Sequence, residues 1–285
     1  MDVRTIGVIG SGQMGEGIAQ VGALSRLGVV VYDVSPEAIK RCQSNHAKRL
    51  AREVEKGRLQ QADVDAALGR LKYVNGLEQL AACDVVIEAA TENFEIKKKI
   101  FVELAKHLTG RQILATNTSS ISITEIAACV PQSADRVIGM HFFNPVPVMK
   151  LVEVIKAVQT SAETTERTIA LATAMGKTPV PANDRAGFVS NRVLMPMINE
   201  AFYAWMEGVA EPAHIDEIMK LGCNFPMGPL RLADFIGLDT CVHIMNVLAD
   251  GLNNDRYRPC PLLKQLVVAG RLGDKTGRGV FEYAK

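Results

Sequence analysis

The sequence predicts an α/β protein with two domains, a doubly wound, mostly parallel sheet domain followed by an all-helical C-terminal domain. Three observations support this. Short apolar runs alternate with longer amphipathic runs from the first residues onward. A glycine-rich turn separates the first apolar run from the helix that follows it. After Gly187 the strand pattern gives way to helical periodicity, so we place the domains at residues 1–186 and 187–285.

The elements of the sheet domain follow from these runs. Ser35-Pro36 opens a long helix, and Ser122 with Glu125 forms a capping box before a short one. Strands are predicted at Thr5–Ile9, Gly28–Tyr32, Asp84–Ala89, Ile113–Ala115, Val137–Met140, Leu151–Ile155 and Thr178–Pro181. Helices are predicted at Met14–Leu27, Ser35–Gly57, Ala62–Leu71, Ile96–Leu108, from Ile123, and at Thr164–Met175.

The C-terminal domain shows three helical runs, Asn191–Met206, Pro212–Leu221 and, less regularly, Leu232–Leu248. The apolar stretch Val193–Ile198 is longer than one small helix needs for its own core. We therefore expect a homodimer formed by the helical domain. Packing of this stretch against the sheet domain is the alternative.

Composition argues against several classes of protein. The 285 residues carry a formal net charge of +1, which gives no overall attraction to nucleic acid or to a membrane surface. Nothing approaches a membrane-spanning apolar run, and the N-terminus enters a strand pattern without a signal-peptide pattern. The 6 cysteines form no CxxC pair, so we expect no metal site and a reducing, cytoplasmic environment.

The segment Gly10-Ser11-Gly12-Gln13-Met14-Gly15 is a G-x-G-x-x-G motif placed between a strand and a helix, which is its Rossmann-type context. We expect this loop, including Gln13 and Met14, to bind a dinucleotide through its pyrophosphate. Asp33 ends the second strand, 23 residues after Gly10. A carboxylate there accepts hydrogen bonds from ribose hydroxyls and repels a 2′-phosphate, which predicts NAD rather than NADP.

A candidate acid–base pair follows later in the sheet domain. His141 directly follows a predicted strand, and Glu153 lies 12 residues further on among Val and Ile. Burying a carboxylate there is costly unless it is paired, and a histidine is a natural partner. From the residues alone, a structural role for His141 is equally compatible. Asn117-Thr118-Ser119-Ser120 follows another strand end and clusters small hydrogen-bonding groups beside the expected nicotinamide. A cap and turn before the helix at Ile123 is the alternative, although Ser122 already serves that purpose.

Several segments together resemble the 3-hydroxyacyl-CoA dehydrogenase family across essentially the whole chain. They are GVIGSGQMGEGIAQ, DVVIEAATEN, ATNTSSISIT, GMHFFNPVPVMKLVEVI, GFVSNRVLMPMINEA, FPMGPLRLADFIGLD and LGDKTGRGVFEY. The resemblance implies NAD-dependent, S-specific oxidation of the 3-hydroxyl of a short 3-hydroxyacyl-CoA such as 3-hydroxybutyryl-CoA, and a dimer. By motif position it implies four catalytic residues, five cofactor contacts and a CoA-contacting lysine. The implied catalytic residues are His141, Glu153, Ser119 and Asn191. The implied cofactor contacts are Asp33, Glu92, Lys97, Asn117 and Asn144, and the CoA-contacting lysine is Lys56.

The long helix after Ser35 offers a site for the phosphates of CoA. Arg49, Arg52 and Lys56 are spaced by three and four residues and share one helix face. Glu53 and Glu55 are expected on the other side, which makes this face locally basic and assigns Arg52 and Lys56 to substrate binding. An ordinary solvated helix face remains the alternative.

Two other functions are compatible with parts of the pattern. A β-hydroxyacid dehydrogenase acting on a free acid resembles a pattern with a catalytic lysine on the inter-domain helix, where this chain has Asn191-Arg192. A non-catalytic NAD-binding protein is the other, and the joint presence of four residues argues against it: His141, Glu153, Ser119 and Asn191.

Overall fold

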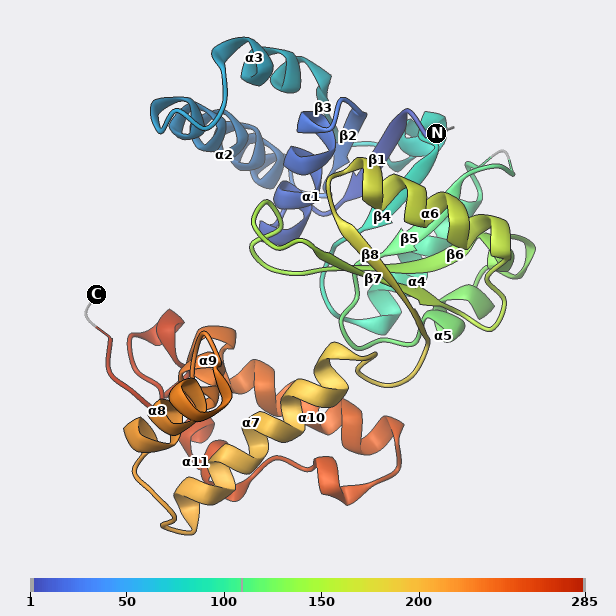
Figure 1. The fold of residues 1–285 in the computed structure, drawn as a ribbon. Coiled ribbons are helices and arrows are strands. Elements are labelled where there is room, and N and C mark those ends of the chain that lie inside the picture. Colours follow the sequence, from blue (N-terminus) through green and yellow to red (C-terminus); the bar gives the residue numbers. More distant parts are fainter. Residues whose placement is uncertain (1–2, 109, 284–285) are drawn as a thin grey trace. The chain divides into compact units, whose positions relative to one another are not determined.

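The structure, a computed structural model, describes residues 3–108 and 110–283. Contacts divide the chain into two units, Met1–Asp184 and Arg185–Lys285, two residues before the predicted boundary. The first unit is a sheet covered by helices and the second is helical (Figure 1). The predicted fold class is confirmed.

The first unit is built on one eight-stranded sheet with the order β3-β2-β1-β4-β5-β6-β7-β8. Neighbouring strands are parallel except β6 and β7, which are antiparallel. The strands are β1 (Thr5–Ile9), β2 (Gly28–Tyr32), β3 (Leu71–Val74), β4 (Val85–Glu88), β5 (Ile113–Thr116), β6 (Val137–Phe142), β7 (Leu151–Lys156) and β8 (Thr178–Asn183). Strands β4, β5 and β6 are buried along their whole length, as expected where helices cover both faces.

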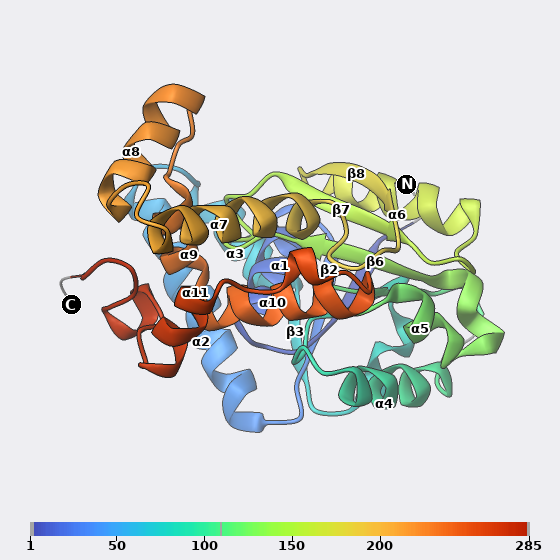
Figure 2. The ribbon, with the colours of Figure 1, turned by 90° about the horizontal axis from the view of Figure 1, so that it is seen from below.

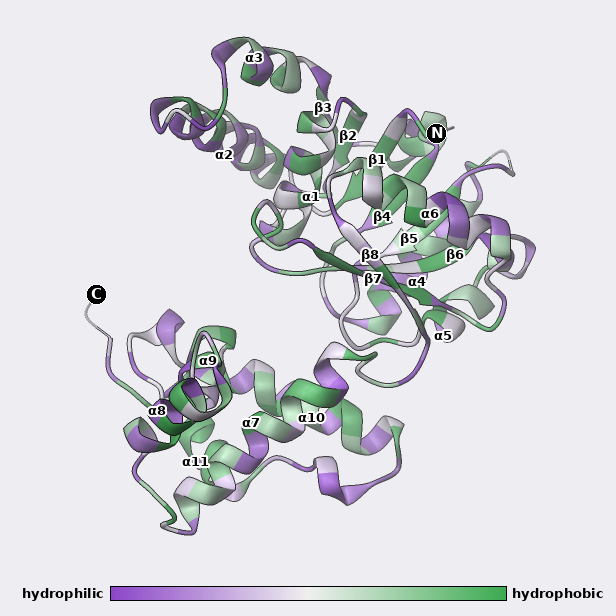
Figure 3. Ribbon diagram, viewed as in Figure 1, coloured by the Kyte–Doolittle hydropathy of each residue, from purple (hydrophilic) through white to green (hydrophobic). Residues whose placement is uncertain are grey.

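Helices cover both faces of this sheet. The helices of the unit are α1 (Gln13–Leu24), α2 (Pro36–Glu55), α3 (Gln61–Arg70), α4 (Phe94–Ala105), α5 (Ile123–Ala128) and α6 (Ala162–Ala174), with 3-10 turns η1 (Leu77–Ala82) and η2 (Pro131–Arg136). Figures 1 and 2 show α6 on one face and α4 and α5 on the other. Residues of α1 and α6 share one apolar core with the strands, and Figure 3 shows how hydrophobic those strands are.

Sequence signals account for the helix ends of this unit. The Ser35 hydroxyl accepts from the amide of Ala38 and Pro36 occupies the first turn, so α2 starts where the sequence predicts. The helix ends beside Gly57, whose φ of +68° suits glycine. Ser122 caps α5 through the amide of Glu125, which confirms the predicted cap.

The second unit packs its own apolar core. Its elements are α7 (Ser190–Met206), α8 (Pro212–Cys223), α9 (Pro229–Ile236), α10 (Leu238–Gly251), η3 (Asp255–Tyr257), α11 (Pro261–Val268) and η4 (Asp274–Thr276). Met195 and Ile198 of α7 contribute to that core. Among the described residues no single helix is long and apolar enough to cross a membrane, although the bent pair α9 and α10 passes by length and composition.

The structure differs from the sequence prediction in four elements. Strand β3 and helix α11 were missed, because both are short and follow directly on stronger helical or turn signals. The predicted run Leu232–Leu248 is two helices that meet at 97°, since Gly237 has a φ of +102° that ends the first. Strand β7 runs antiparallel to β6, and β8 runs parallel to β7, a reversal of direction that short apolar runs do not reveal.

Candidate active site

The glycine loop lies between β1 and α1 and fits a dinucleotide. Gly10 has a φ of +97°, and a Cβ there would lie 2.6 Å from the carbonyl oxygen of Ala89. A Cβ on Gly15 would overlap the carbonyl of Gly10, so the fold itself requires both glycines. Gly12 differs, because its φ is −75° and a Cβ would meet nothing within 4 Å. Its small size therefore serves an approaching ligand at the amino end of α1, as a pyrophosphate would need.

Asp33 faces this loop from the end of β2. Its carboxylate accepts from the amide and hydroxyl of Ser11, both at 2.8 Å, and from the amide of Ser35 at 3.0 Å. Burial raises the pKa of Asp33, but the hydrogen bonds from Ser35 and Ser11 outweigh it, and the net pKa is lowered. The charged carboxylate keeps lone pairs for ribose hydroxyls, and its neighbour Val34 brings no cation for a 2′-phosphate.

We expect kcat/KM to be about a hundredfold or more higher with NAD than with NADP, because like charges brought together cost several kcal/mol. Asp33→Asn keeps an acceptor for Ser11 and removes the charge, so it should lower the ratio of kcat/KM with NAD to kcat/KM with NADP. Steady-state rates with each nucleotide measure it. Equal use of NADP by the unaltered protein would contradict the assignment to Asp33.

The His141–Glu153 pair is a cross-strand pair. The antiparallel register of β6 and β7 places the two residues directly opposite each other, and Nδ1 of His141 lies 2.7 Å from Oε2 of Glu153. Both side chains are buried. The carboxylate accepts a hydrogen bond from Nδ1–H and so fixes the tautomer, in which Nε2 is the ring nitrogen able to take up a proton. His141 lies inside β6, one residue before its end, rather than after the strand as predicted.

The loop after β5 brings Asn117 and Ser119 to the same edge. Oδ1 of Asn117 accepts from the amide of Phe142, which ties this loop to the residue after His141. The backbone amide and hydroxyl of Ser119 both donate to Oε1 of Glu92, at 2.9 and 3.2 Å. The Ser119 hydroxyl must turn from Glu92 to donate to a substrate oxygen, and its predicted role stays a prediction.

Glu92 is a partly exposed member of an ionic cluster whose other two members, Glu88 and Lys97, are buried, and the sequence only partly indicated this cluster. Burial raises its pKa, but Lys97 and donors from Thr118, Ser119 and Ser120 lower it overall. Lys97 is 1% exposed, and its Nζ lies 2.8 Å from both carboxylate oxygens of Glu88. Its predicted contact with the cofactor stays a prediction. Glu88 was not predicted from the sequence. The one signal for it is an acidic residue at the end of an otherwise apolar strand.

A groove of about 550 Å³ lies between α2 and the segment after β6. It is lined by Gln13, Arg49, Arg52, Lys56, Arg58 and Asn144 among others. The predicted position of Glu53 is wrong, because it also lines the groove, 3.9 Å from Lys56 and 3.3 Å from Arg58. Residues 49, 53 and 56 share one helix face by the same spacing rule. Arg49 is engaged by the buried Glu16 at 3.0 Å.

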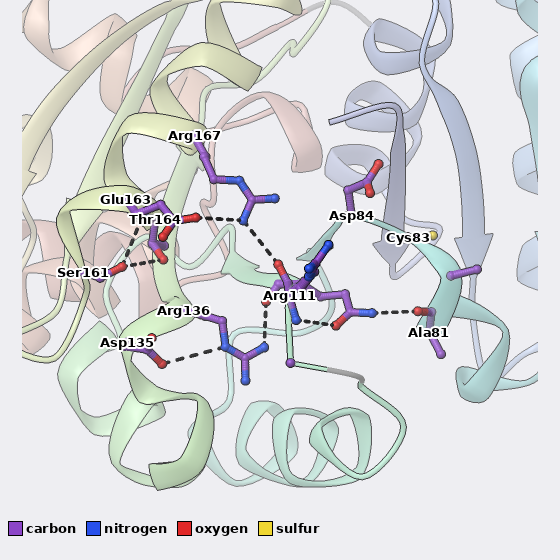
Figure 4. A pocket seen from close by; sticks show the side chains of 13 residues that line it. Ala81, Cys83, Asp84, Arg111, Asp135, Arg136, Ser161, Glu163, Thr164 and Arg167 are labelled. Carbon is purple, nitrogen blue, oxygen red and sulfur yellow. Dashed lines mark hydrogen bonds and ion pairs between the residues drawn. The ribbon is translucent and has the colours of Figure 1, made fainter. Parts of the chain in front are cut away.

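A larger cavity of about 860 Å³ opens at the opposite, amino-terminal edge of the sheet (Figure 4). Its lining includes three arginines, Arg111, Arg136 and Arg167, and an equal number of acidic residues, Asp84, Asp135 and Glu163, so their formal charges cancel. Arg136 and Arg167 donate to the carbonyl oxygens of Gln112 and Arg111, which braces the start of β5. With no net charge and far from the carboxyl ends of the strands, this cavity is not the catalytic site.

The remaining predicted residues are distributed as follows. Asn191 is buried in the first turn of α7, in the second unit. Met14 packs against the core of the first unit, while Gln13 and Asn144 line the groove. The described residues contain no group of three or more His, Cys, Asp or Glu side chains able to hold a metal ion.

A glycine loop, an acidic strand end and a buried His–Glu pair along one edge of a parallel sheet define a dinucleotide-dependent oxidoreductase. The chain belongs to the 3-hydroxyacyl-CoA dehydrogenase family. The model of the family's NAD binding domain matches residues 5–185, and that of its C-terminal domain matches residues 187–283. Its cofactor is NAD.

Relatives match over the full length. A probable 3-hydroxybutyryl-CoA dehydrogenase of Bacillus subtilis is 54% identical over 99% of this chain and 98% of its own. The 3-hydroxybutyryl-CoA dehydrogenase of Bradyrhizobium diazoefficiens is 48% identical over 99% and 96%, respectively. The crystal structure of (S)-3-hydroxybutyryl-CoA dehydrogenase from Ralstonia eutropha has a TM-score of 0.97, with 50% identity and full coverage of both chains.

Proposed function

We propose that the protein catalyses the reversible, NAD-dependent oxidation of (S)-3-hydroxybutyryl-CoA to acetoacetyl-CoA. The buried His141–Glu153 pair, at 2.7 Å on the edge that carries the glycine loop, is the observation that carries the chemistry. The names of the full-length relatives support a short 3-hydroxyacyl thioester as the substrate. We also propose a cytoplasmic location, because all 6 cysteines are free.

Each residue of the proposed site has a separate role in the reaction. In oxidation, Nε2 of His141 takes the proton of the 3-hydroxyl as the C3–H bond breaks and the carbonyl forms. Glu153 stabilises the resulting imidazolium through its contact with Nδ1. Ser119, and Asn191 in the second unit, donate to substrate oxygens. Bound NAD supplies the hydride acceptor. In reduction, the same histidine returns the proton to the oxygen.

A substrate comparison tests this proposal. We expect turnover of acetoacetyl-CoA with NADH, and no comparable turnover of free acetoacetate under the same conditions. A β-hydroxyacid dehydrogenase would use the free acid, and a non-catalytic NAD-binding protein would use neither. A series of 3-ketoacyl-CoA thioesters of increasing chain length then measures the acyl preference. A clear optimum at a longer chain would replace the four-carbon substrate.

The groove beside α2 is the proposed site for the phosphates of CoA. Figure 3 shows α2 as largely hydrophilic, and its residues Arg52 and Lys56 line the groove. Guanidinium and ammonium groups bind phosphates through charge-assisted hydrogen bonds. Glu53 reduces the positive charge there through its ion pairs with Lys56 and Arg58.

We expect Arg52→Ala combined with Lys56→Ala to raise the KM for acetoacetyl-CoA by about tenfold, since two charged hydrogen bonds are lost. The KM for NADH should change little. Steady-state kinetics measure both constants, and the wild-type KM for the thioester should rise with salt. Lys98→Ala with Lys99→Ala, two exposed lysines of α4, is the matched control. An unchanged KM for acetoacetyl-CoA in the groove variant would make this an ordinary solvated surface.

A homodimer through the helical unit is also proposed. Ile218 and Leu221 on α8 are 62% and 77% exposed and share one helix face. Ile218→Glu with Leu221→Glu should convert the dimer to a monomer, because charges at an apolar interface lose their water without gaining partners. Sedimentation at micromolar concentration measures the mass. Val158→Glu, at an exposed valine of the first unit, is the control. A monomeric wild-type protein would contradict the proposal.

A further inference from the structure

The cluster formed by the buried Glu88 and Lys97 with the partly exposed Glu92 lies where a bound nicotinamide must pass. In the sheet order, the glycine loop follows β1 and His141 lies on β6, with β4 and β5 between them. Glu88 is the last residue of β4, and Glu92 lies in the loop that follows it. A dinucleotide whose pyrophosphate is at the glycine loop, and whose reactive ring reaches His141, therefore crosses the ends of β4 and β5.

The contacts of Glu88 show that it is a carboxylate. Its oxygens accept from the amide of Ala90 and the hydroxyl of Thr116, both at 2.7 Å, and from Nζ of Lys97 at 2.8 Å. The amide and the ammonium can only donate, and an ammonium at this distance favours the charged carboxylate. The side chain is 1% exposed, so it contacts its neighbours rather than solvent.

The cluster keeps one uncompensated negative charge. Lys97 is the single ammonium between two carboxylates, 2.8 Å from Glu88 and 3.5 Å from Glu92. Glu92 takes its other hydrogen bonds from neutral donors on Thr118, Ser119 and Ser120. Lys97 and Glu88 are both 1% exposed, whereas the side chain of Glu92 is 29% exposed, so water reaches the cluster at Glu92 and a ligand there can meet its charge directly.

We propose that this cluster sets the relative affinity of the enzyme for NAD⁺ and NADH, with Glu88 as a positioning residue that acts through Lys97 and Glu92. The nicotinamide ring of NAD⁺ carries a positive charge, and the ring of NADH is neutral because the added hydride cancels that charge. A fixed negative charge beside the ring stabilises the oxidised form and leaves the reduced form almost unaffected. The inference rests on the proposed function in that the ring reaches His141.

The test is a comparison of dissociation constants in the absence of any acyl-CoA. NADH binding is followed by its fluorescence, and NAD⁺ binding by displacement of NADH. In Glu88→Gln we expect the Kd for NAD⁺ to rise about tenfold while the Kd for NADH stays within about twofold. Glu92→Gln removes the same charge at a partly exposed position and should shift the ratio in the same direction, which covers a failure of Glu88→Gln to fold.

Two further variants separate charge from structure. Thr116→Val removes one hydrogen bond to Glu88 but no charge, so the ratio of the two constants should not change. Glu88→Gln combined with Lys97→Gln leaves Glu92 as the one charge of the cluster. The ratio of the Kd for NAD⁺ to the Kd for NADH in this double variant should therefore return toward the wild-type value. A merely structural role predicts that both constants rise together and that the double variant is the most impaired.

An unchanged ratio in the folded charge variants, or a parallel rise of both constants, would overturn the inference. So would a double variant whose ratio is as far from the wild-type value as that of Glu88→Gln. These outcomes are independent of the acyl substrate. Failure to turn over acetoacetyl-CoA with the ratios as expected would instead overturn the proposed function and leave the role of the cluster intact.

Discussion

His141→Ala should lower kcat by a factor of about 10² or more, because a positioned general acid or base contributes at least that much to proton transfer. Histidine suits this step because it exchanges protons near neutral pH. The buried position of His141 beside Glu153 holds the ring in one orientation, so water does not easily replace it. The measurement is kcat for acetoacetyl-CoA reduction under saturating NADH.

The control for this variant separates chemistry from folding and cofactor binding. NADH should bind His141→Ala with a nearly unchanged Kd, because the glycine loop and Asp33 lie on other strands. His107 is a partly exposed histidine just after the end of α4, and its Nε2 lies 3.5 Å from Oε1 of Glu103. The control variant His107→Ala should keep the full wild-type kcat. A kcat for His141→Ala close to that of the wild type would show that another group transfers the proton.

Glu153→Gln should lower kcat by about 10²-fold and change the pH dependence of kcat. The amide of glutamine removes the charge that stabilises the imidazolium, and it can turn its NH₂ group toward Nδ1 and favour the wrong tautomer. Both effects act through His141, so the double variant His141→Ala, Glu153→Gln should be little worse than His141→Ala alone. Rates of the three variants across pH measure this coupling.

The structure supplies a control of equal charge for Glu153. Glu163→Gln changes a glutamate at the start of α6, where its side chain is 80% exposed, and it should leave the pH profile as in the wild type. Multiplicative losses in the double variant, or an unaltered pH profile in Glu153→Gln, would mean that the carboxylate does not act through the histidine.

The α2 helix shows where sequence reasoning succeeds and where it stops. Its start at Ser35-Pro36 was predictable because capping is local chemistry of a few consecutive residues. Arg52 and Lys56 were predicted to lie on one basic face of α2, and both line the groove. Glu53 was predicted on the opposite side, but it lines the same groove. Helical spacing tells which residues share a face, yet which part of that face borders a groove depends on what packs beside the helix.

The His141–Glu153 pair shows the same division at the active site. A glutamate among Val and Ile needs a partner, and this energetic argument pointed from the sequence to a nearby histidine. The sequence did not show that β6 and β7 run antiparallel, although this register places the two side chains opposite each other. Strand direction is decided by how the connection between two strands folds, and short apolar runs look alike in either direction.

The sequence by itself determined the sheet-then-helices architecture and the glycine loop of an NAD-binding domain, and it predicted Asp33 for the ribose and His141 with Glu153 as the acid–base pair. Each depends on local spacing, on hydrophobic periodicity or on a motif of adjacent residues. Only the tertiary structure decided the antiparallel edge of the sheet, the break between α9 and α10 and the joining of Glu88, Lys97 and Glu92 into one charged cluster. These features arise where separate segments meet, and the energy of a buried charge depends on every group that surrounds it in space.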